Sequence, residues 1–314
     1  MHSSLARYLI FFQYIGTKYR LVQVFSILRL RPENHVSLYV SSRTDAGVHA
    51  LSNSAHFDLQ RKNKAPFTEE ILRDAINFHL REQSIRVTRA VRVPLDFHSR
   101  FQAQSRTYLY RVALGPDKTQ IPLSDSELCW NLCTTELDID SMREAAAILK
   151  GTHDFSSFRA INSDLPFKNP VKTMDQICVQ PGSSFTSNHF HRHIPFWELT
   201  FTSKSFLYKQ VRRMAGALVA VGRGRLSPLS LKKVLDARDS TAFPQGLSAP
   251  AHGLFLTNVE YRDEGESAVN HTDCSSCLTH KPCIFRLSSS LKLKTVFHLV
   301  MSSCGNTGSA PLCF

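Results

Sequence analysis

Arg43-Thr44-Asp45-Ala46-Gly47-Val48-His49-Ala50 is the stretch of this 314-residue chain that indicates most about its fold and its chemistry. It follows an alternating segment, residues 36–40, that has the pattern of a β-strand. An aspartate that follows a strand and precedes two small residues presents its carboxylate with little steric cover. The flanking Arg43 and His49 predict an ionised Asp45, because nearby positive charge favours the anion. A carboxylate that attacks carbon has to be charged, so Asp45 is a candidate nucleophile.

The same residues also fit a simple turn. In that interpretation Asp45 bonds its own backbone near Gly47, which is a common use of the sequence Asp-x-Gly. On spacing alone the turn is the better interpretation. The choice between the two therefore depends on the rest of the chain.

Hydrophobic periodicity along the chain predicts strands and helices without a regular alternation. Strands are expected over residues 8–14, 36–40, 85–93, 106–112, 173–180, 196–202 and 253–261. Helices are expected from a Thr68 cap to about residue 80, over residues 139–150 and 205–222, and after Pro228. The first helix has an apolar stripe formed by Ile71, Leu72, Ala75, Ile76 and Leu80. This order predicts the α+β class with a largely antiparallel sheet.

The net charge of +12 favours polyanionic partners, because each Lys or Arg that meets a phosphate releases counterions. Basic residues that could follow a nucleic-acid backbone are Arg86, Arg89, Arg92, Arg100, Arg106, Lys209 and Arg213. No Gly-rich phosphate loop of the dinucleotide or P-loop type is present, which argues against a nucleotide cofactor. No apolar run approaches the roughly 20 residues of a membrane-spanning helix.

Eight cysteines are unevenly placed, with five of them beyond residue 262. The N-terminus leaves no room for a signal peptide before the first strand, so we expect free thiols in a reducing compartment. Cys274 and Cys277 have the spacing of a first zinc-ligand pair. His280 and Cys283 follow too closely for a zinc finger or ribbon, so no metal site is expected.

The octapeptide around Asp45 resembles the signature of the TruA-type tRNA pseudouridine synthases. Four further segments resemble the other motifs of that family in the same order. They are residues 96–101 with 105–110, residues 151–159, residues 206–216 and residues 250–256. Together the motifs span roughly residues 7 to 262, which favours the nucleophile interpretation of Asp45 over the turn.

The resemblance implies an enzyme, an isomerase, in which Asp45 forms a covalent adduct with the target uridine. The C1′–N1 bond breaks, the uracil turns and a C1′–C5 bond forms; attack at C1′ and attack at C6 both remain open. Tyr108 corresponds to a tyrosine that lies against the base, and Arg212 to an arginine that pairs with the catalytic carboxylate. Leu254 corresponds to an apolar wall of the uracil pocket. Arg43 corresponds to a residue that fills the space of a flipped-out uridine.

The resemblance further implies the pseudouridine synthase fold, with two similar halves around a basic cleft. The halves are expected at residues 1–115, with Asp45 and Tyr108, and at residues 116–262, with Arg212 and Leu254. Residues 263–314 are expected to be a poorly ordered tail. The resemblance implies tRNA as partner, with other RNA as an alternative, and a homodimer without cofactor or membrane contact. The sequence is compatible with the mitochondrion and with the cytosol.

The chain departs from the family pattern after Arg20. The loop that probes the tRNA in relatives, and much of the helix that follows it, are absent, and the crossover from residue 14 to Val36 is short for parallel strands. The tail after Arg262 resembles nothing in the family. These departures leave a second hypothesis, an RNA-binding relative with impaired catalysis.

Overall fold

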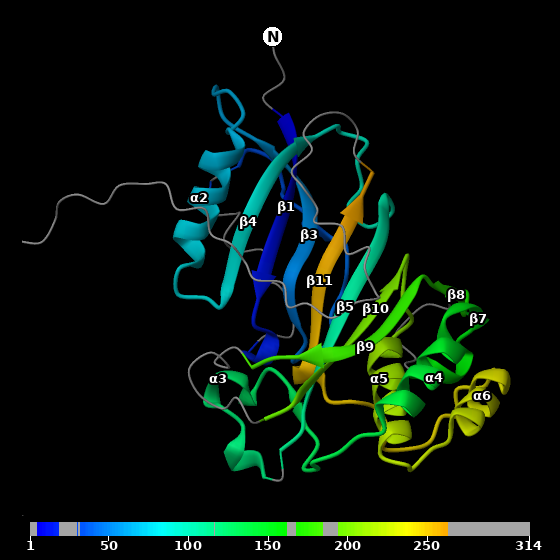
Figure 1. Cartoon of the computed structure of the whole chain (residues 1–314). Helices are drawn as coiled ribbons and strands as arrows, with labels where there is room; N and C mark the ends of the chain where they lie inside the picture. Colours follow the sequence, from blue (N-terminus) through cyan, green and yellow to red (C-terminus); the bar gives the residue numbers. More distant parts are fainter. Residues whose placement is uncertain are drawn as a thin grey trace, which may run out of the picture. The chain divides into compact units, whose positions relative to one another are not determined.

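Nine strands within the described part of the chain form one sheet, as seen in the computed structural model (Figure 1). The structure describes residues 5–18, 30, 32–115, 117–161, 168–184 and 194–262. The sheet follows the order β4-β1-β3-β11-β5-β10-β9, with β2 on β3 and β6 on β5. The strands are β1 (Leu5–Tyr14), β2 (Tyr39–Val40), β3 (His49–Gln60), β4 (Ile85–Val93), β5 (Ala103–Ala113), β6 (Trp130–Asn131), β9 (Gln176–Gly182), β10 (Phe196–Ser203) and β11 (Leu254–Tyr261). A second ladder pairs β7 (Gly151–Asp154) with β8 (Val171–Met174).

The strand pairs are antiparallel except at two short contacts. β11 pairs in parallel with β3 through Phe255 and His49, and β6 pairs in parallel with β5. On its other edge β11 pairs antiparallel with β5, so the last strand lies between two strands from the first 115 residues. This confirms the α+β class with a largely antiparallel sheet.

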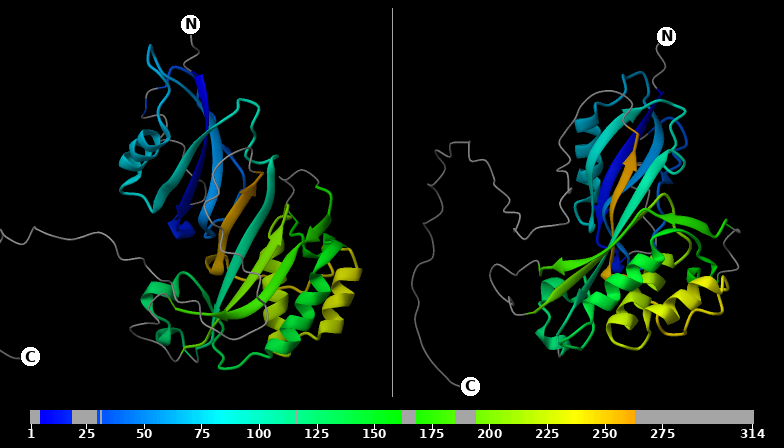
Figure 2. Two further views of the ribbon diagram at one scale, coloured as in Figure 1. Left: turned by 45° about the horizontal axis from the view of Figure 1, so that its top comes forward. Right: turned by 45° about the vertical axis from the view of Figure 1, so that its right-hand side comes forward.

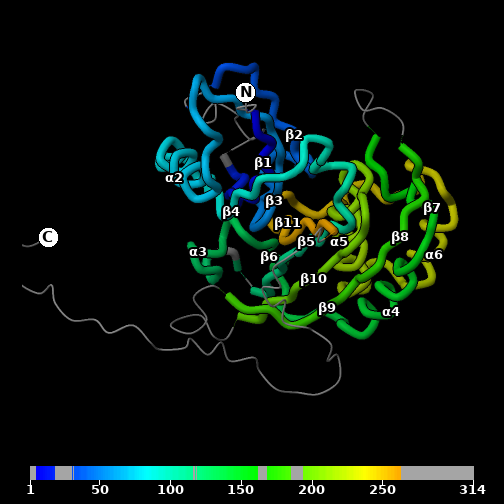
Figure 3. The backbone as a smooth tube through the Cα atoms, turned by 90° about the horizontal axis from the view of Figure 1, so that it is seen from above, coloured from blue at the N-terminus to red at the C-terminus, as the bar shows by residue number. Residues whose placement is uncertain are grey.

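The helices lie at the two ends of this sheet (Figures 2 and 3). α2 (Glu69–Leu80) packs against β4 at one end. α4 (Ile139–Leu149), α5 (Gln210–Gly222) and α6 (Pro228–Asp236) gather near β9 at the other end. The remaining helical turns are α3 (Leu123–Ser126), η1 (Gly16–Lys18), η2 (Lys118–Gln120), η3 (Ser156–Phe158) and η4 (Ala251–Gly253).

One hydrophobic core joins the sheet to both groups of helices. Its largest fully buried side chains are aromatic: Tyr8, Phe12, Phe57, Tyr110 and Phe201 on strands of the sheet, and Phe155 and Phe158 at η3. Complete burial of one such side chain stabilises the folded state by roughly 1.5–3 kcal/mol. The core therefore holds the central strands, and the loops at their ends, in fixed positions.

The strand predicted over residues 36–40 was wrong in length. Only Tyr39 and Val40 are in a strand, and β2 pairs antiparallel with β3. Because β1 also pairs antiparallel with β3, β2 runs in the same direction as β1, and the chain crosses over between the two strands. The twelve-residue strand β3 begins at His49, inside the octapeptide, and was not predicted because its buried positions include the polar residues His49, Asn53 and His56.

The other predicted elements are confirmed with local corrections. The strand expected over residues 173–180 is interrupted at Asp175. β8, before the interruption, pairs with β7, and β9, after it, pairs with β10. α5 begins at Gln210 instead of Ser205, because Lys209 has a left-handed φ of 55° that a right-handed helix cannot include. Ile71 is 55% exposed, so the buried stripe of α2 is Leu72, Ile76 and Leu80.

Several predictions fall outside the described residues. They concern the shortened segment after Arg20 and the tail from residue 263, including its cysteines and the expectation that they form no zinc site. Within the described residues, Cys129, Cys133 and Cys178 are free thiols. A helix of the length and apolarity required to cross a bilayer is not found in the described part of the chain.

Candidate active site

Asp45 lies in the loop that joins β2 to β3. Its backbone carbonyl accepts a hydrogen bond from Val48 N–H at 3.1 Å, and Gly47 has a φ of 81°. A positive φ at the third position is typical of a type II turn, which favours glycine there. A turn is thus present, but the backbone carbonyl of Asp45 closes it, and the Asp45 side chain does not make the bond that the turn interpretation assigned to it.

The Asp45 carboxylate meets Arg212, in the first turn of α5. Arg212 Nη1 donates to Asp45 Oδ2 at 3.0 Å, and the two side chains are 16% and 21% exposed. Arg212 Nε also donates to Ala249 O at 2.8 Å, and Ala249 N–H donates to Arg212 O at 3.0 Å. Charge-assisted hydrogen bonds of this kind are strong and directional. The Arg212 guanidinium is therefore held through Nε, and through Nη1 it holds Oδ2 of Asp45 in place.

Tyr108 lies on β5 next to the same loop. Its side chain is 9% exposed and its ring stands edge-on to Phe206, with centroids 5.2 Å apart. Burial is the main cause that raises the pKa of the Tyr108 phenol; the hydrogen bond to Ser42 opposes the shift, and the charge of Asp45 adds to it. The phenol is therefore protonated at neutral pH and within electrostatic range of Asp45.

The other two predicted residues flank this group. Arg43 is exposed, two residues before Asp45. Leu254 is buried at the start of β11, where it pairs with Tyr110 of β5, and the next residues of β11 pair with the start of β3. The structure thus brings Asp45, Arg212 and Tyr108 together around one loop, with Arg43 on its surface and Leu254 in the core beneath. The catalytic roles of all five stay predictions.

His49 has a different part from the one predicted, because it is fully buried and does not face Asp45 as a cation. Its Nδ1 accepts from Gly16 N–H at 3.0 Å, so Nε2 carries the proton and donates to His252 O, also at 3.0 Å. Burial lowers the pKa of this imidazole, and the ring stacks on Phe255. A neutral His49 joins η1, the octapeptide and η4 into one support for the loop.

Arg106 also departs from its prediction as an RNA-facing cation. It is 7% exposed, and its guanidinium donates to the carbonyls of Lys204 at 2.6 Å and Arg100 at 2.9 Å. It also donates to Ser41 O and to Ser42 Oγ, each at 3.3 Å. Arg106 therefore ties the start of the Asp45 loop to the strand that carries Tyr108.

Two further supports were missed by the sequence analysis. Asn53 Nδ2 donates to Ser42 O at 3.0 Å, and the Tyr14 hydroxyl is 2.7 Å from Thr44 Oγ1. Both side chains are buried. A buried asparagine needs hydrogen-bond partners, and that rule would have singled out Asn53 had its strand been recognised.

The remaining basic residues divide into surface and interior groups. Arg86, Arg89 and Arg92 are exposed along β4, as predicted. Arg213 instead turns inward, where Nη1 donates to the carbonyls of Ser157 and Arg159 at 3.1 and 2.8 Å. Arg213 thus supports the region of η3 and does not contribute to a surface for RNA.

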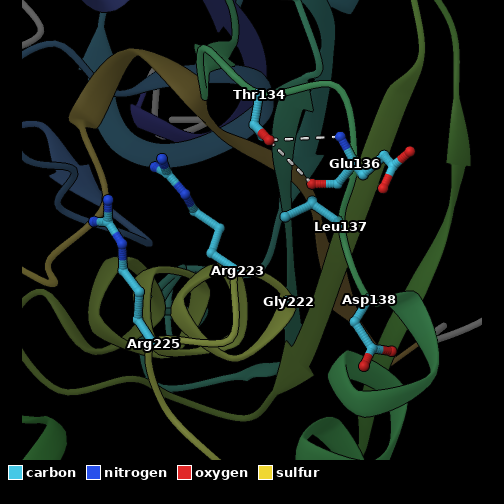
Figure 4. Close-up of a pocket in the computed structure, with 7 residues that line it drawn as sticks. All are labelled: Thr134, Glu136, Leu137, Asp138, Gly222, Arg223 and Arg225. Carbon is cyan, nitrogen blue, oxygen red and sulfur yellow. Dashed lines mark hydrogen bonds between the residues drawn. The ribbon is translucent and has the colours of Figure 1, made fainter.

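An open pocket lies apart from this site (Figure 4). It is lined by Thr134, Glu136, Leu137, Asp138, Gly222, Arg223 and Arg225. Gly222 ends α5, and Arg212 lies in the first turn of that helix. At about 1.5 Å per residue, roughly 15 Å of helix separates the two, so this pocket does not contain the Asp45 carboxylate.

Comparison with known proteins gives consistent matches. A family model described as tRNA pseudouridine synthase matches residues 145–262. The chain is 47% identical over 278 residues to tRNA pseudouridine synthase-like 1 of Xenopus laevis, covering 83% of this chain and 93% of the relative. The Homo sapiens protein of that name is 46% identical, covering 84% of this chain and 92% of its own length. tRNA pseudouridine synthase A of Ehrlichia ruminantium (strain Gardel) is 38% identical, covering 73% of this chain and 84% of the relative.

The two vertebrate relatives match more than four fifths of this chain. Identity of this level over most of both chains, together with the family match, establishes common ancestry. The chain belongs to the TruA-type tRNA pseudouridine synthase family.

Proposed function

We propose that this chain isomerises uridine to pseudouridine in tRNA, with Asp45 as the covalent catalyst. The observation that carries the proposal is the 3.0 Å ion pair between Asp45 and Arg212. It holds a part-buried carboxylate in one orientation while keeping it accessible at 21% exposure. Relatives named for this reaction in tRNA support the choice of substrate.

The reaction balances without an added reactant. The Asp45 carboxylate adds to the target nucleotide at C1′ or at C6, and the C1′–N1 bond breaks. The uracil turns so that C5 faces C1′, and a C1′–C5 bond forms as Asp45 leaves. The proton on C5 departs and N1 gains one, so the product is an isomer of the substrate.

The surrounding residues supply the positioning that such a step requires. Tyr108, protonated because of its burial, packs its ring against the uracil, and Leu254 closes the apolar side of the base. Arg43 occupies the space that the uridine leaves when it turns out of its stack, since the sugar carbon is otherwise shielded. Arg212 keeps the nucleophilic oxygen aligned through the whole sequence.

The quaternary structure belongs to the same proposal. The enzyme acts as a homodimer whose two subunits both contact one tRNA. Sedimentation velocity of the free protein and of its tRNA complex measures this directly. Two protein chains per tRNA are expected, and a complex with one chain at saturation contradicts the dimer.

Release of tritium from tRNA labelled at uridine C5 tests the activity, because the C5–H bond is lost only when the new C–C bond forms. Wild type is expected to release tritium, Asp45→Ala none above background, and Asp74→Ala as much as wild type. Asp74 is a suitable control because it is an exposed carboxylate on α2, paired with the neighbouring Arg73. If the wild type binds tRNA but releases no more tritium than Asp45→Ala, the chain is a non-catalytic RNA-binding relative.

A further inference from the structure

The segment between β4 and β5, residues 94–102, is part of a family motif but supplies none of the residues of the proposed reaction. Two turns fold it, with Phe97 N–H bonded to Pro94 O and Gln102 N–H to His98 O, both at 3.0 Å. Ser99 anchors it to the sheet: its hydroxyl donates to Tyr39 O at 2.6 Å and its N–H to His56 Nδ1 at 3.1 Å. The segment is therefore a fixed part of the fold beside β2.

Three aromatic side chains lie in this segment or next to it: Tyr39, His98 and Phe101. We call these three residues the aromatic platform. Tyr39 stacks on the buried His56 ring at 5.0 Å and 14°, and His98 lies 5.7 Å from Tyr39 and 4.3 Å from Phe101. Yet Tyr39 is 50% exposed and Phe101 is 73% exposed. Rings that are held in place by their neighbours and still face solvent are preorganised to stack on a further planar group.

Cations lie beside the platform. The Arg100 guanidinium lies 5.9 Å from the centre of the Phe101 ring. Burial lowers the pKa of the Lys168 ammonium, and the charges of Arg100, Lys172, Arg43 and Arg159 lower it further. Lys168 therefore lies within electrostatic range of four other cations, and one of these, Arg100, lies beside the Phe101 ring. Such a cluster is stabilised by a polyanion.

The platform is also connected to the catalytic loop. Arg106 Nη2 donates both to Arg100 O, inside the segment, and to Ser41 O, at the start of the loop. Arg43 is at once a member of the cationic cluster and a neighbour of Asp45. The platform is thus joined through Arg106 to the loop that carries Asp45.

We infer that Tyr39, His98 and Phe101 form a stacking site for an unpaired nucleobase of the substrate RNA, next to phosphates held by Arg100 and Lys168. Unpaired bases stacked on aromatic side chains, with basic groups along the backbone, are the usual means of recognising RNA outside its helices. The inference rests on the proposed function and adds a contact away from the target uridine. A partner protein would also cover exposed rings, but the cations beside them favour RNA.

The test replaces Phe101 and measures the Kd for tRNA at about 0.1 M salt. Phe101→Leu keeps an apolar side chain and removes the π face, so its Kd is expected to rise roughly 5- to 100-fold. Phe101→Trp keeps the π face and is expected to bind as wild type, with its added fluorescence quenched as tRNA saturates. Phe78→Leu is the matched control, since Phe78 is 59% exposed and lies under Arg81 on α2; its Kd is expected to be unchanged.

Unchanged affinity of Phe101→Leu, or an unquenched tryptophan at saturation, overturns the inference. So does a result in which Phe101→Leu alters self-association in sedimentation but not the Kd for tRNA, which identifies a protein interface. Thermal unfolding of each variant separates these effects from loss of fold. Tritium release by the wild type is measured beside them, so that failure of the stacking site and failure of the proposed activity give different patterns.

Discussion

The side chains of Asp45 and Arg212 meet at 3.0 Å although the residues are 167 positions apart in the chain. The contact depends on two independent supports. The loop of Asp45 is held by Arg106, Asn53 and His49, and Arg212 is held by the backbone of Ala249. Changes to either support are therefore expected to affect catalysis without contact with the substrate.

Replacement of Arg212 by lysine tests the orientation of the carboxylate. Lysine keeps the positive charge but loses the second hydrogen bond of the guanidinium, to Ala249 O. We expect kcat to fall on the order of 100-fold, with little change in Kd for tRNA. Single-turnover rates measure this, and Arg225→Lys, on the separate pocket, serves as the control. Equal rates for Arg212→Lys and wild type would show that the fixed orientation is unimportant.

Replacement of Arg106 by methionine tests the support of the loop. The change removes the donor from the buried carbonyl of Ser41 and from the part-buried carbonyls of Lys204 and Arg100, and a buried carbonyl left without a donor costs about 1–3 kcal/mol. We expect a lower free energy of unfolding and a lower kcat, measured by urea unfolding and tritium release. Arg86→Met, at an exposed position of β4, is expected to change neither. A destabilised Arg106→Met protein with wild-type kcat contradicts a positioning role.

Replacement of two glycines that have similar φ angles distinguishes the effect of backbone strain on stability from its effect on catalysis. Gly47 has a φ of 81° and Gly246 a φ of 76°, so alanine at either position costs about 1–2 kcal/mol of stability. Gly246 has open space around it, while Gly47 is in the turn that carries Asp45. Both variants are expected to melt at lower temperature, but only Gly47→Ala is expected to lose kcat. Equal activities would mean that the turn does not set the position of the carboxylate.

The free energy of unfolding is expected to depend on pH in part through the protonation of His56. Burial, and then the charges of His98 and Arg7, lower the pKa of this imidazole from 6.5 to about 4. Between these two values the unfolded chain binds a proton that the folded chain does not. The free energy of unfolding therefore falls as pH falls through this window, by about 3 kcal/mol in total.

Urea unfolding at a series of pH values measures this term. The pH dependence is expected to be weaker in His56→Gln and unchanged in His35→Gln, whose imidazole is exposed. A constant difference in stability between His56→Gln and wild type from pH 4 to 7 would exclude the shift, since the window lies between the cited values.

The hydrophobic pattern of the sequence predicted those strands whose buried positions are mostly apolar. β1, β4, β5, β10 and β11 were found within a few residues of their ends, because their alternation or apolar content is strong. β3 was missed because its buried positions include Asn53 and His56, whose hydrogen bonds satisfy them inside the protein but which look polar in a sequence. Local pattern cannot show that a polar side chain has a partner elsewhere.

The site was predicted less evenly than the fold. The residues alone favoured a turn at Asp45, and its pairing with Arg212 came from the resemblance to a family, since no local period joins positions so far apart. The assignment of a cationic role to His49 was wrong, because the ring is buried and is held in its neutral form by hydrogen bonds to η1 and η4. Arg106 and Arg213 likewise looked like surface cations, although both donate to interior carbonyls.

The most direct test of the account is the single-turnover conversion of tRNA by Asp45→Asn, which keeps the size of the side chain and removes its charge. With enzyme in excess, the tRNA is digested to nucleosides, and pseudouridine is separated from uridine by chromatography because the two have the same mass. We predict wild-type formation of pseudouridine, none by Asp45→Asn, and equal Kd values for tRNA. Formation of pseudouridine by Asp45→Asn at the wild-type rate would contradict the claim that Asp45 is the nucleophile.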